Sequence, residues 1–331
     1  MNNEDYNNWL KWTEENIYKN VDIESIKHVL HNNNTFTNET IDYMINMANY
    51  NIENRKNKIN HWILSVKSDL YNNVNKIMEL NKLPQWESFL NNFYAQNKPV
   101  IIRNSLLEVY KKYDIYYLYN TYDNFEVEIQ ANRENTENYE SKSNDLKSNM
   151  GFKDFLNIVN NQTSNNIYMT ANNNNNENIK HIKNDILYNL RNDNYAPWSY
   201  LNNDYDGRSF LWIGPKGTKT PWHYDLTNNL FIQIQGQKKI TLIPFEHNIN
   251  MYNNNHVYTD IPSFDYNLEE VYNKFPNFSN IKPIELIINE GDVLFIPLGW
   301  WHKVQSLNPS ISLSFTNFKA KNDYNNTYPS N

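Results

Sequence analysis

The segments 220-TPWHYD-225 and 290-EGDVLFIPLGWWH-302 decide the fold and the chemistry that this sequence supports. His223 and Asp225 are two residues apart, and successive side chains of a β-strand alternate between its two faces. If the first segment is extended, both side chains therefore point to the same side. His302 lies far downstream, so it must arrive on another strand if it is to join them.

The second segment contains the features that would deliver His302. Gly291–Asp292 predicts a turn, 293-VLFIP-297 a short buried strand, and Pro297–Gly299 a second turn. Two histidines and one carboxylate on adjacent strands form the arrangement that holds non-haem Fe(II) and leaves coordination positions open. The sequence therefore predicts a metal site made by His302 and the two residues of the first segment.

Short apolar segments surround these two stretches throughout the second part of the chain. Gly, Pro, Asn and Asp separate them, which is typical of an antiparallel sandwich or barrel. A short helix is expected between Pro84 and a turn at Asn97–Pro99, and a second helix at about 179–191. The expected strands are 100-VIIRN-104, 124-NFEVEIQAN-132, 166-NIYMTANN-173, 209-SFLWIGP-215, 231-FIQIQG-236, 238-KKITLIP-244, 284-IELIIN-289, 293-VLFIP-297 and 311-ISLSFTNF-318.

The first part of the chain has helical periodicity instead. Apolar residues recur every three to four positions in the segments 7–20, 22–33, 37–51 and 56–81, and Asp22 is placed to cap the second of these helices. We predict an α+β protein with a helical N-terminal region (1–83), a jelly-roll β-domain (84–320) and a polar tail (321–331).

Composition excludes several classes of protein. The chain has 331 residues, a net charge of −7 and no cysteine. Thiol nucleophiles, disulfides and Cys-ligated metals are therefore excluded, and the acidic balance disfavours nucleic acid as a partner. The first residues have no apolar signal region, and no long apolar run predicts a membrane span. We expect a cytoplasmic protein with no membrane partner.

Three blocks of the sequence resemble the JmjC and cupin-like Fe(II)- and 2-oxoglutarate-dependent oxygenases. They are 220-TPWHYDLTNNLFIQIQGQKKITLIP-244, 290-EGDVLFIPLGWWHKV-304 and 311-ISLSFTNF-318. The resemblance is strongest to the branch of small hydroxylases that includes the asparaginyl hydroxylase of hypoxia-inducible factor, and to bacterial cupin-like proteins with a helical N-terminal extension. It extends over about residues 84–320, and more loosely over residues 5–80, and it implies that the jelly roll is a double-stranded β-helix of the cupin type.

The resemblance implies a role for eight residues. The iron ligands, and thus the catalytic centre, fall on His223, Asp225 and His302. The far carboxylate of 2-oxoglutarate falls to Thr220, Lys238 and Tyr168, and its metal-bound end to Asn229 and Asn317. Lys239 is the alternative to Lys238, but strand alternation allows only one of the two to face inward.

The implied activity is hydroxylation with Fe(II), 2-oxoglutarate and O2, which yields succinate and CO2. A side chain of a peptide or protein is the first expected substrate. The alternatives are demethylation of N-methyl-lysine or N-methyl-arginine, hydroxylation of a tRNA base or of a small metabolite, and, from a different class, a cupin-type binding module without turnover. The oligomeric state is left open. The other histidines of this part, His181, His247 and His256, are expected in solvated loops.

Overall fold

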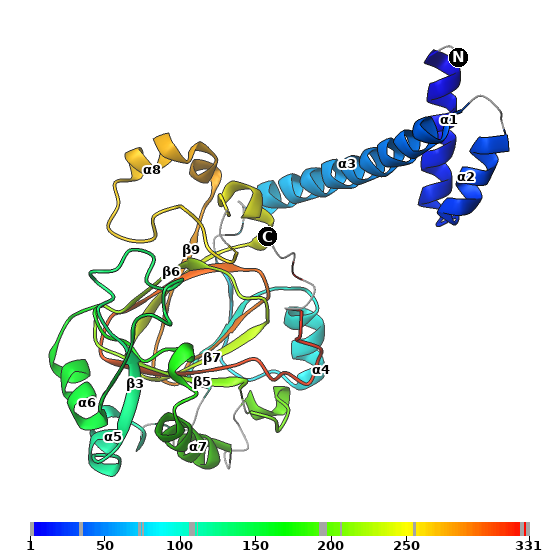
Figure 1. The fold of residues 1–331 in the computed structure, drawn as a ribbon. Coiled ribbons are helices and arrows are strands. Elements are labelled where there is room, and N and C mark those ends of the chain that lie inside the picture. The colour runs from blue at the N-terminus through cyan, green and yellow to red at the C-terminus, as the bar shows by residue number, and fades with distance from the viewer. Residues whose placement is uncertain are drawn as a thin grey trace. The chain divides into compact units, whose positions relative to one another are not determined.

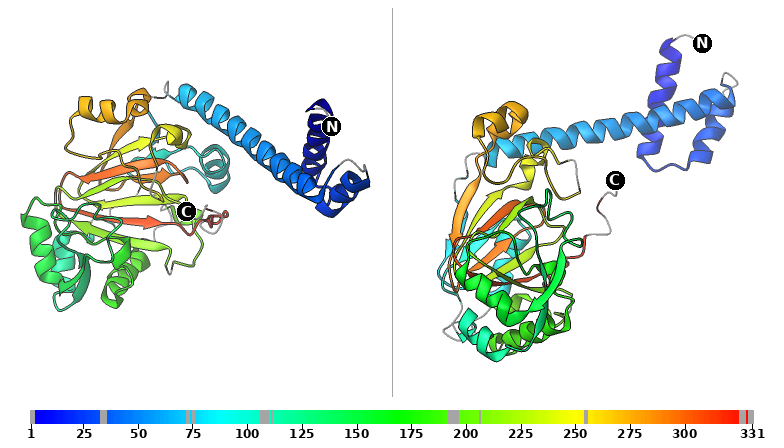
Figure 2. Two further views of the ribbon diagram at one scale, coloured as in Figure 1. Left: turned by 45° about the horizontal axis from the view of Figure 1, so that its top comes forward. Right: turned by 60° about the vertical axis from the view of Figure 1, so that its left-hand side comes forward.

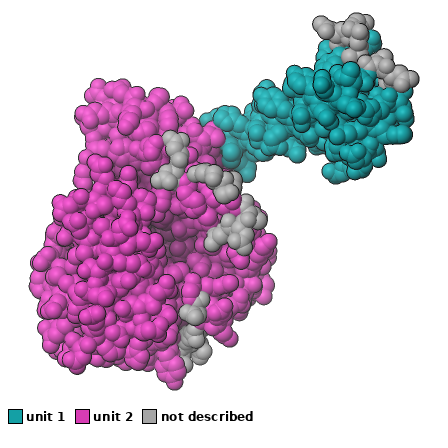
Figure 3. All heavy atoms as spheres, viewed as in Figure 1, with its two compact units in different colours: residues 1–69 teal, residues 70–331 magenta. Residues whose placement is uncertain are grey.

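The computed structural model describes residues 3–32, 36–71, 74, 76–105, 110, 112–191, 197–205, 207–253, 256–324 and 328. By compactness the chain divides into unit 1, Met1–Asp69, and unit 2, Leu70–Asn331 (Figure 3). The domain boundaries expected from the sequence, at 83/84 and 320/321, stay predictions. Within the described residues, no helix combines the length and the apolar character needed to cross a bilayer.

Unit 1 is helical, as the periodicity predicted. Asp22 caps the second helix, because its Oδ2 accepts a hydrogen bond of 3.0 Å from the backbone N–H of Ser25. Ile26 and Leu30 pack against Met44 to form the centre of a small separate core. The helices are α1 Asn3–Tyr18, α2 Ile23–Asn32 and α3 Asn38–Tyr71, whose last residues belong to unit 2.

Helix α3 differs from the sequence prediction in two ways: it has no break between residues 51 and 56, and it ends ten residues earlier than expected. The expected helices 37–51 and 56–81 form one continuous helix that ends at Tyr71. Residues Met78–Leu80, predicted as helix, form strand β1, which pairs in parallel with β2, Val100–Ile102. Met, Glu and Leu are good helix formers, but pairing with the edge of a sheet outweighs this local preference.

The β-rich part of unit 2 confirms the predicted jelly roll. One sheet has six strands in the order β1-β2-β10-β7-β12-β5, and the other has four in the order β6-β11-β8-β9. The two sheets face each other (Figures 1 and 2). The remaining bounds are β3 Glu126–Gln130, β4 Lys147–Gly151, β5 Ser209–Gly214, β6 Lys219–His223, β7 Asn229–Gln235, β8 Lys238–Ile243, β9 Ile284–Ile288, β10 Val293–Ile296, β11 Trp301–Ser306 and β12 Ser310–Phe315.

Strand β11 lies between β6 and β8 and connects the two site segments of the sequence. In its register His302 lies opposite His223 of β6 on one side and Leu242 of β8 on the other. Further along the same strand, Ser306 lies opposite Lys238. The hydrogen-bonded ladder therefore sets how far Lys238 is from the two histidines.

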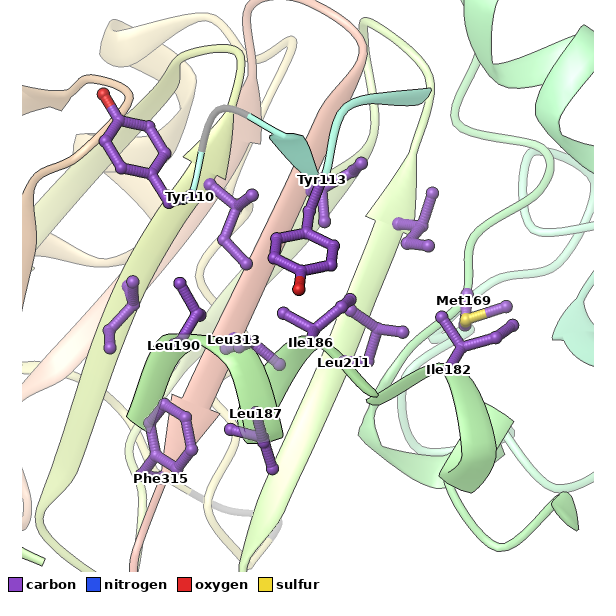
Figure 4. Close-up of a cluster of buried hydrophobic side chains, with 14 of the residues drawn as sticks. Tyr110, Tyr113, Met169, Ile182, Ile186, Leu187, Leu190, Leu211, Leu313 and Phe315 are labelled. Atoms are coloured by element: carbon purple, nitrogen blue, oxygen red, sulfur yellow. The ribbon is translucent and has the colours of Figure 1, made fainter. Parts of the chain in front are cut away.

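Both faces of the six-stranded sheet are buried. On the inner face, Phe231, Leu294 and Ile296 pack against Ile240 and Leu242 of the smaller sheet. On the outer face, α7 (Glu177–Arg191) confirms the helix expected near 179–191. Figure 4 shows the contact, in which the labelled residues Ile182, Ile186, Leu187 and Leu190 of α7 lie over Leu211, Leu313 and Phe315 of the sheet.

The alternation of β12 shows what this two-sided burial requires. Ile311, Leu313 and Phe315 belong to the core under α7, whereas the alternate residues Ser312 and Ser314 are buried on the other face. A strand of period two thus presents apolar side chains to the helix and hydroxyls to the interior of the jelly roll.

One predicted strand is wrong. Residues 166–173 form only isolated bridges, Gln130 with Tyr168 and Met169 with Ile213, followed by a short 3₁₀ turn at Ala171–Asn173. Asn173 and Thr170 account for the difference, since Asn173 Oδ1 accepts from the backbone N–H of Thr170 at 3.0 Å and ends the extended segment.

Three of the four short helices of unit 2 have no counterpart in the sequence prediction, and the one that begins at Trp86 confirms the short helix expected before Asn97. The α-helix near 84–99 continues into a π-helical turn, Leu90–Tyr94. The helices are α4 Trp86–Phe89, α5 Ile115–Thr121, α6 Phe152–Asn161 and α8 Leu268–Lys274. Their buried residues cover the outside of the strands, as Phe152 and Phe155 of α6 do in the larger core.

Candidate metal centre

Three residues from two segments of unit 2 come together inside the jelly roll. His223 ends β6, Asp225 follows it by two residues, and His302 stands near the start of β11. One ligand atom from each lies within 4.8 Å of the others. The backbone N–H of Gly299 donates to the carbonyl of Asp225 at 3.1 Å, so the turn before β11 is fixed to the segment after β6.

The distances suit one shared ion. His223 Nε2 lies 4.0 Å from Asp225 Oδ1, and His302 Nε2 lies 3.8 Å from Asp225 Oδ2. The two imidazole rings are 4.1 Å apart between centroids. Two nitrogen ligands and one carboxylate on one side of an ion leave its other positions free, which is the facial arrangement of non-haem iron sites.

Both imidazoles are held in the tautomer that a metal requires. His223 Nδ1 is 2.9 Å from the carbonyl of Pro221, and His302 Nδ1 is 2.9 Å from the carbonyl of Trp300. A carbonyl only accepts, so each Nδ1 carries the proton and each Nε2 presents a lone pair. Backbone carbonyls in this position orient metal-binding histidines.

Burial keeps His302 uncharged. Loss of solvent, and then the neighbouring His223, lower its pKa to about 4, although Asp225 acts in the opposite direction. The ring is therefore neutral near pH 7, as a metal ligand must be.

Asn229 fixes the carboxylate of the site. Its Nδ2 donates to Asp225 Oδ2 at 3.2 Å, and its Oδ1 is buried with no hydrogen-bond partner among the described residues. A buried amide oxygen that lacks a partner is unusual in a folded protein. It marks a place beside the three residues where a donor from a bound molecule would fit.

A pocket extends from the three residues into the jelly roll. Four of the five residues that the resemblance assigned to the cosubstrate line it. The lining residues are Tyr168, Trp212, Thr220, His223, Asp225, Asn229, Phe231, Lys238, Ile240, Ile296, His302, Val304 and Ser314.

Lys238 is the one cation in the lining of this pocket. Its side chain is only 1% exposed, and its Nζ donates to the hydroxyl of Tyr168 at 3.2 Å. Burial lowers its pKa to about 7. A lysine buried without a carboxylate is costly, and a bound anion would return it to the charged form. Its neighbour Lys239 instead pairs with Glu285 outside the pocket, at 2.9 Å.

Asn317 is placed differently from the other expected residues. It is buried, but it does not contribute to the lining of this pocket. Its Nδ2 donates to the carbonyl of Asn202 at 2.7 Å, and its backbone carbonyl accepts from the N–H of the same residue. These contacts tie the segment after β12 to a neighbouring loop.

Several lining residues were not assigned a role from the sequence. Ser314 and Trp212 lie on paired strands, and the indole Nε1 of Trp212 donates to Ser314 Oγ at 2.9 Å. The alternation of serines in β12 was a usable signal for an inward polar face. Of the three other histidines of unit 2, His256 is exposed in a turn, as expected. His247 is 1% exposed, so the solvated-loop prediction for it is wrong, and His181 is exposed but lies on α7 and not in a loop.

A larger cleft of about 750 Å³ borders β6 at Lys219, Pro221 and Trp222. Tyr258 also lines it and forms a β-bridge with His223, with ring centroids 6.3 Å apart. Burial, followed by the charges of Glu140 and Asp225, raises the pKa of Tyr258 to about 12. Tyr258 therefore lies between the cleft and the candidate metal ligands.

A jelly roll that carries two histidines and a carboxylate beside a buried lysine defines a cupin-type metal-binding protein. The family comparison agrees. The model of the cupin-like domain matches residues 86–324, and the chain belongs to that family.

Relatives of known name share shorter segments. JmjC domain-containing protein D of Dictyostelium discoideum is 41% identical over 104 residues, which are 31% of this chain and 23% of that protein. Lysine-specific demethylase 8 of Xenopus tropicalis is 40% identical over 113 residues, 31% of this chain and 24% of its own. The HSPB1-associated protein 1 homolog of Danio rerio is 35% identical over 108 residues, which are 31% of this chain and 24% of that protein. The match thus spans about a quarter of these relatives.

Proposed function

We propose that the protein is an Fe(II)- and 2-oxoglutarate-dependent oxygenase that hydroxylates a side chain of a peptide or protein. The observation that carries this proposal is the placement of His223, Asp225 and His302 in the lining of the same pocket as the buried Lys238. Such a pocket offers a metal and a carboxylate anchor to the same small molecule. Membership of the small-hydroxylase branch stays a prediction.

The ligand set fits iron and its cosubstrate. His223, Asp225 and His302 would hold the metal, and Lys238, with Thr220 and Tyr168, would hold the far carboxylate of 2-oxoglutarate. When bound, iron and 2-oxoglutarate supply the oxidation of a C–H bond by O2, with succinate and CO2 as co-products.

The residues of the chain bind and orient the reactants. Asn229 holds Asp225 in place, and the two backbone carbonyls hold the imidazoles. Phe231, Ile240 and Ile296 form an apolar wall, which excludes water and strengthens the attraction between Lys238 and a carboxylate.

The proposal of a polymeric substrate is supported by the cleft beside β6, which is open and reaches the β-bridge partner of His223. Demethylation of N-methyl-lysine is the second candidate, because relatives in Xenopus and Arabidopsis are named lysine-specific demethylases. Both reactions begin with oxidation of a C–H bond, so the same site could perform either.

Turnover and binding test the proposal together. Anaerobic protein with Fe(II) should bind 2-oxoglutarate, and in air it should form succinate in the presence of a substrate peptide library. Asp225→Ala should abolish metal binding, and Lys238→Met should abolish cosubstrate binding. Lys239→Met, on the neighbouring residue, is the matched control and should behave as wild type.

The mass of the product separates the candidates. Hydroxylation adds one oxygen to a peptide, whereas demethylation removes a CH2 group. If the wild-type protein binds neither Fe(II) nor 2-oxoglutarate, the oxygenase proposal is wrong, and a binding module without turnover becomes the better description.

A further inference from the structure

Arg133 lies between the cleft and the pocket, because it contacts residues that line each of them, and no motif assigned it a role. Its side chain is 0% exposed, although it contributes to the lining of the cleft. A fully buried arginine is rare unless its charge is paired. Its Nη2 donates to Glu140 Oε1 at 2.9 Å, and this carboxylate also belongs to the cleft.

The guanidinium group is packed between two tyrosine rings. It lies 4.3 Å from the ring centroid of Tyr139, in the wall of the cleft, and 5.3 Å from that of Tyr168, in the wall of the pocket. Cation–π contacts are strongest where water is excluded. Arg133 therefore holds the ring whose hydroxyl accepts the hydrogen bond from Lys238.

Arg133 also holds the backbone next to Thr220. Its Nη2 donates to the carbonyl of Lys219 at 2.7 Å, and the hydroxyl of Tyr139 donates to the same carbonyl at 3.1 Å. Lys219 directly precedes Thr220 on β6. One side chain thus fixes the positions of two residues proposed to bind the far carboxylate, Tyr168 and Thr220, without lining their pocket itself.

A third contact completes the support. Nη1 of Arg133 donates to Gln130 Oε1, and Gln130 pairs through its backbone with Tyr168, at 2.9 Å and 3.0 Å. Arg133 thus contacts the ring of Tyr168 directly, and it also contacts the side chain of Gln130, whose backbone pairs with that of Tyr168.

We infer that Arg133 is a positioning residue for the cosubstrate: it arranges Tyr168 and Thr220 around Lys238, and it connects this arrangement to the cleft through Glu140. The inference rests on the proposed function. It predicts that loss of Arg133 weakens 2-oxoglutarate binding while the turnover rate at saturating 2-oxoglutarate is kept, because Arg133 contacts no reacting atom.

The test compares full-length variants by calorimetric titration of the Mn(II)-loaded protein with 2-oxoglutarate. In Arg133→Met/Glu140→Gln, the two charges are removed together, so no buried carboxylate is left unpaired. We expect the Kd for 2-oxoglutarate to rise about tenfold or more, as when supporting residues of a metal site are removed. The KM for 2-oxoglutarate should rise equally, with kcat within about twofold.

Two further variants make the result specific. Arg133→Lys keeps the charge but loses the planar stacking, and it should give a smaller loss of affinity. Glu134→Gln changes a neighbouring carboxylate of the cleft, which accepts from Ser164 and Asn165 and not from Arg133, and its affinity should equal that of wild type.

The outcomes separate this inference from the proposed function. If wild type fails to bind 2-oxoglutarate, the proposed function is wrong. If wild type binds it and the folded double variant, or the folded Arg133→Lys variant, binds it equally well, the role of Arg133 is overturned. A fall in kcat with an unchanged KM would also contradict it, because it would indicate a catalytic role.

Discussion

A single buried lysine makes the stability of this protein depend on pH. Lys238 has a pKa of about 7 in the folded chain, against 10.5 in its ordinary state. Between these values the unfolded chain binds more protons, so stability rises with pH across this window and falls as the pH approaches 7. This loss of stability comes from burial of the lysine in the pocket, and an apolar residue of similar size would avoid it.

We therefore expect Lys238→Met to stabilise the metal-free protein near pH 7.5 by about 1 kcal/mol or more, and to flatten the rise of stability between about pH 7 and 10. Urea unfolding at several pH values measures both. Adding 2-oxoglutarate to the Mn(II)-loaded proteins should stabilise wild type further and leave the Mn(II)-loaded variant unchanged. A variant that is less stable than wild type at every pH would contradict this account.

Asn229 gives a second prediction at this scale. Asn229→Ala removes the donor to Asp225 Oδ2 and leaves the carboxylate free to rotate. We expect the affinity for Mn(II) to fall about tenfold, as for other residues that orient metal ligands. Calorimetry measures it, with the exposed Asn161→Ala on α6 as the control. Equal affinities would show that the hydrogen bond does not orient Asp225.

A short motif in the sequence located the residues of the candidate metal centre. His223 and Asp225 follow from one motif, and the structure brings them together with His302. Thr220 and Lys238 follow from the resemblance, whose motif position favoured Lys238 over Lys239, and their roles stay predictions. Arg133 could not be found in this way, because its partners Tyr168 and Lys219 are distant in sequence and only the folded chain brings them together.

At the scale of elements, the turn before β11 decides whether the site forms. Gly299 has φ +80°, and a Cβ there would lie 2.8 Å from the ring of Phe245. Both the backbone conformation and the space require glycine at this position. The turn places the N–H of Gly299 on Asp225 and directs the chain into His302.

Gly299→Ala should lower the free energy of unfolding by about 2 kcal/mol or more and weaken Mn(II) binding. Gly207→Ala is a matched control, because Gly207 has φ +63° but no atom within 4 Å of the added Cβ. It carries the backbone strain without the clash, so its loss should be smaller and its metal affinity unchanged. If urea unfolding shows the same loss of stability for both variants, the contact with Phe245 does not contribute to it.

Elements whose form depends on a distant partner were the ones that the sequence did not predict. Strands β7, β8 and β10 have strong patterns and were expected. Strand β1 has a helix-like composition and becomes a strand only because β2 offers an edge. The segment 166–173 has a strand-like composition, but Thr170 and Asn173 close it into a turn.

At the scale of the whole molecule, all residues of the proposed site belong to unit 2. The core of unit 1 is separate and built around α2 and α3. We expect a chain of residues 70–331 to bind Mn(II) and 2-oxoglutarate with the affinity of the full chain, measured by calorimetry. Loss of binding in this folded fragment would show that unit 1 is needed for the site.

The register of β11 has a consequence for the choice of cosubstrate. Its ladder places His302 and Ser306, the partner of Lys238, four positions apart on one strand, about 13 Å between backbones. The hydrogen bonds of the sheet fix this backbone separation. The distance between the metal and Lys238 Nζ therefore selects the cosubstrate by the length of its carbon chain. Oxaloacetate, shorter by one carbon, and 2-oxoadipate, longer by one, should both bind at least about tenfold more weakly than 2-oxoglutarate in competition titrations. Comparable binding of all three would mean that the Lys238 side chain, and not the strand, sets the length.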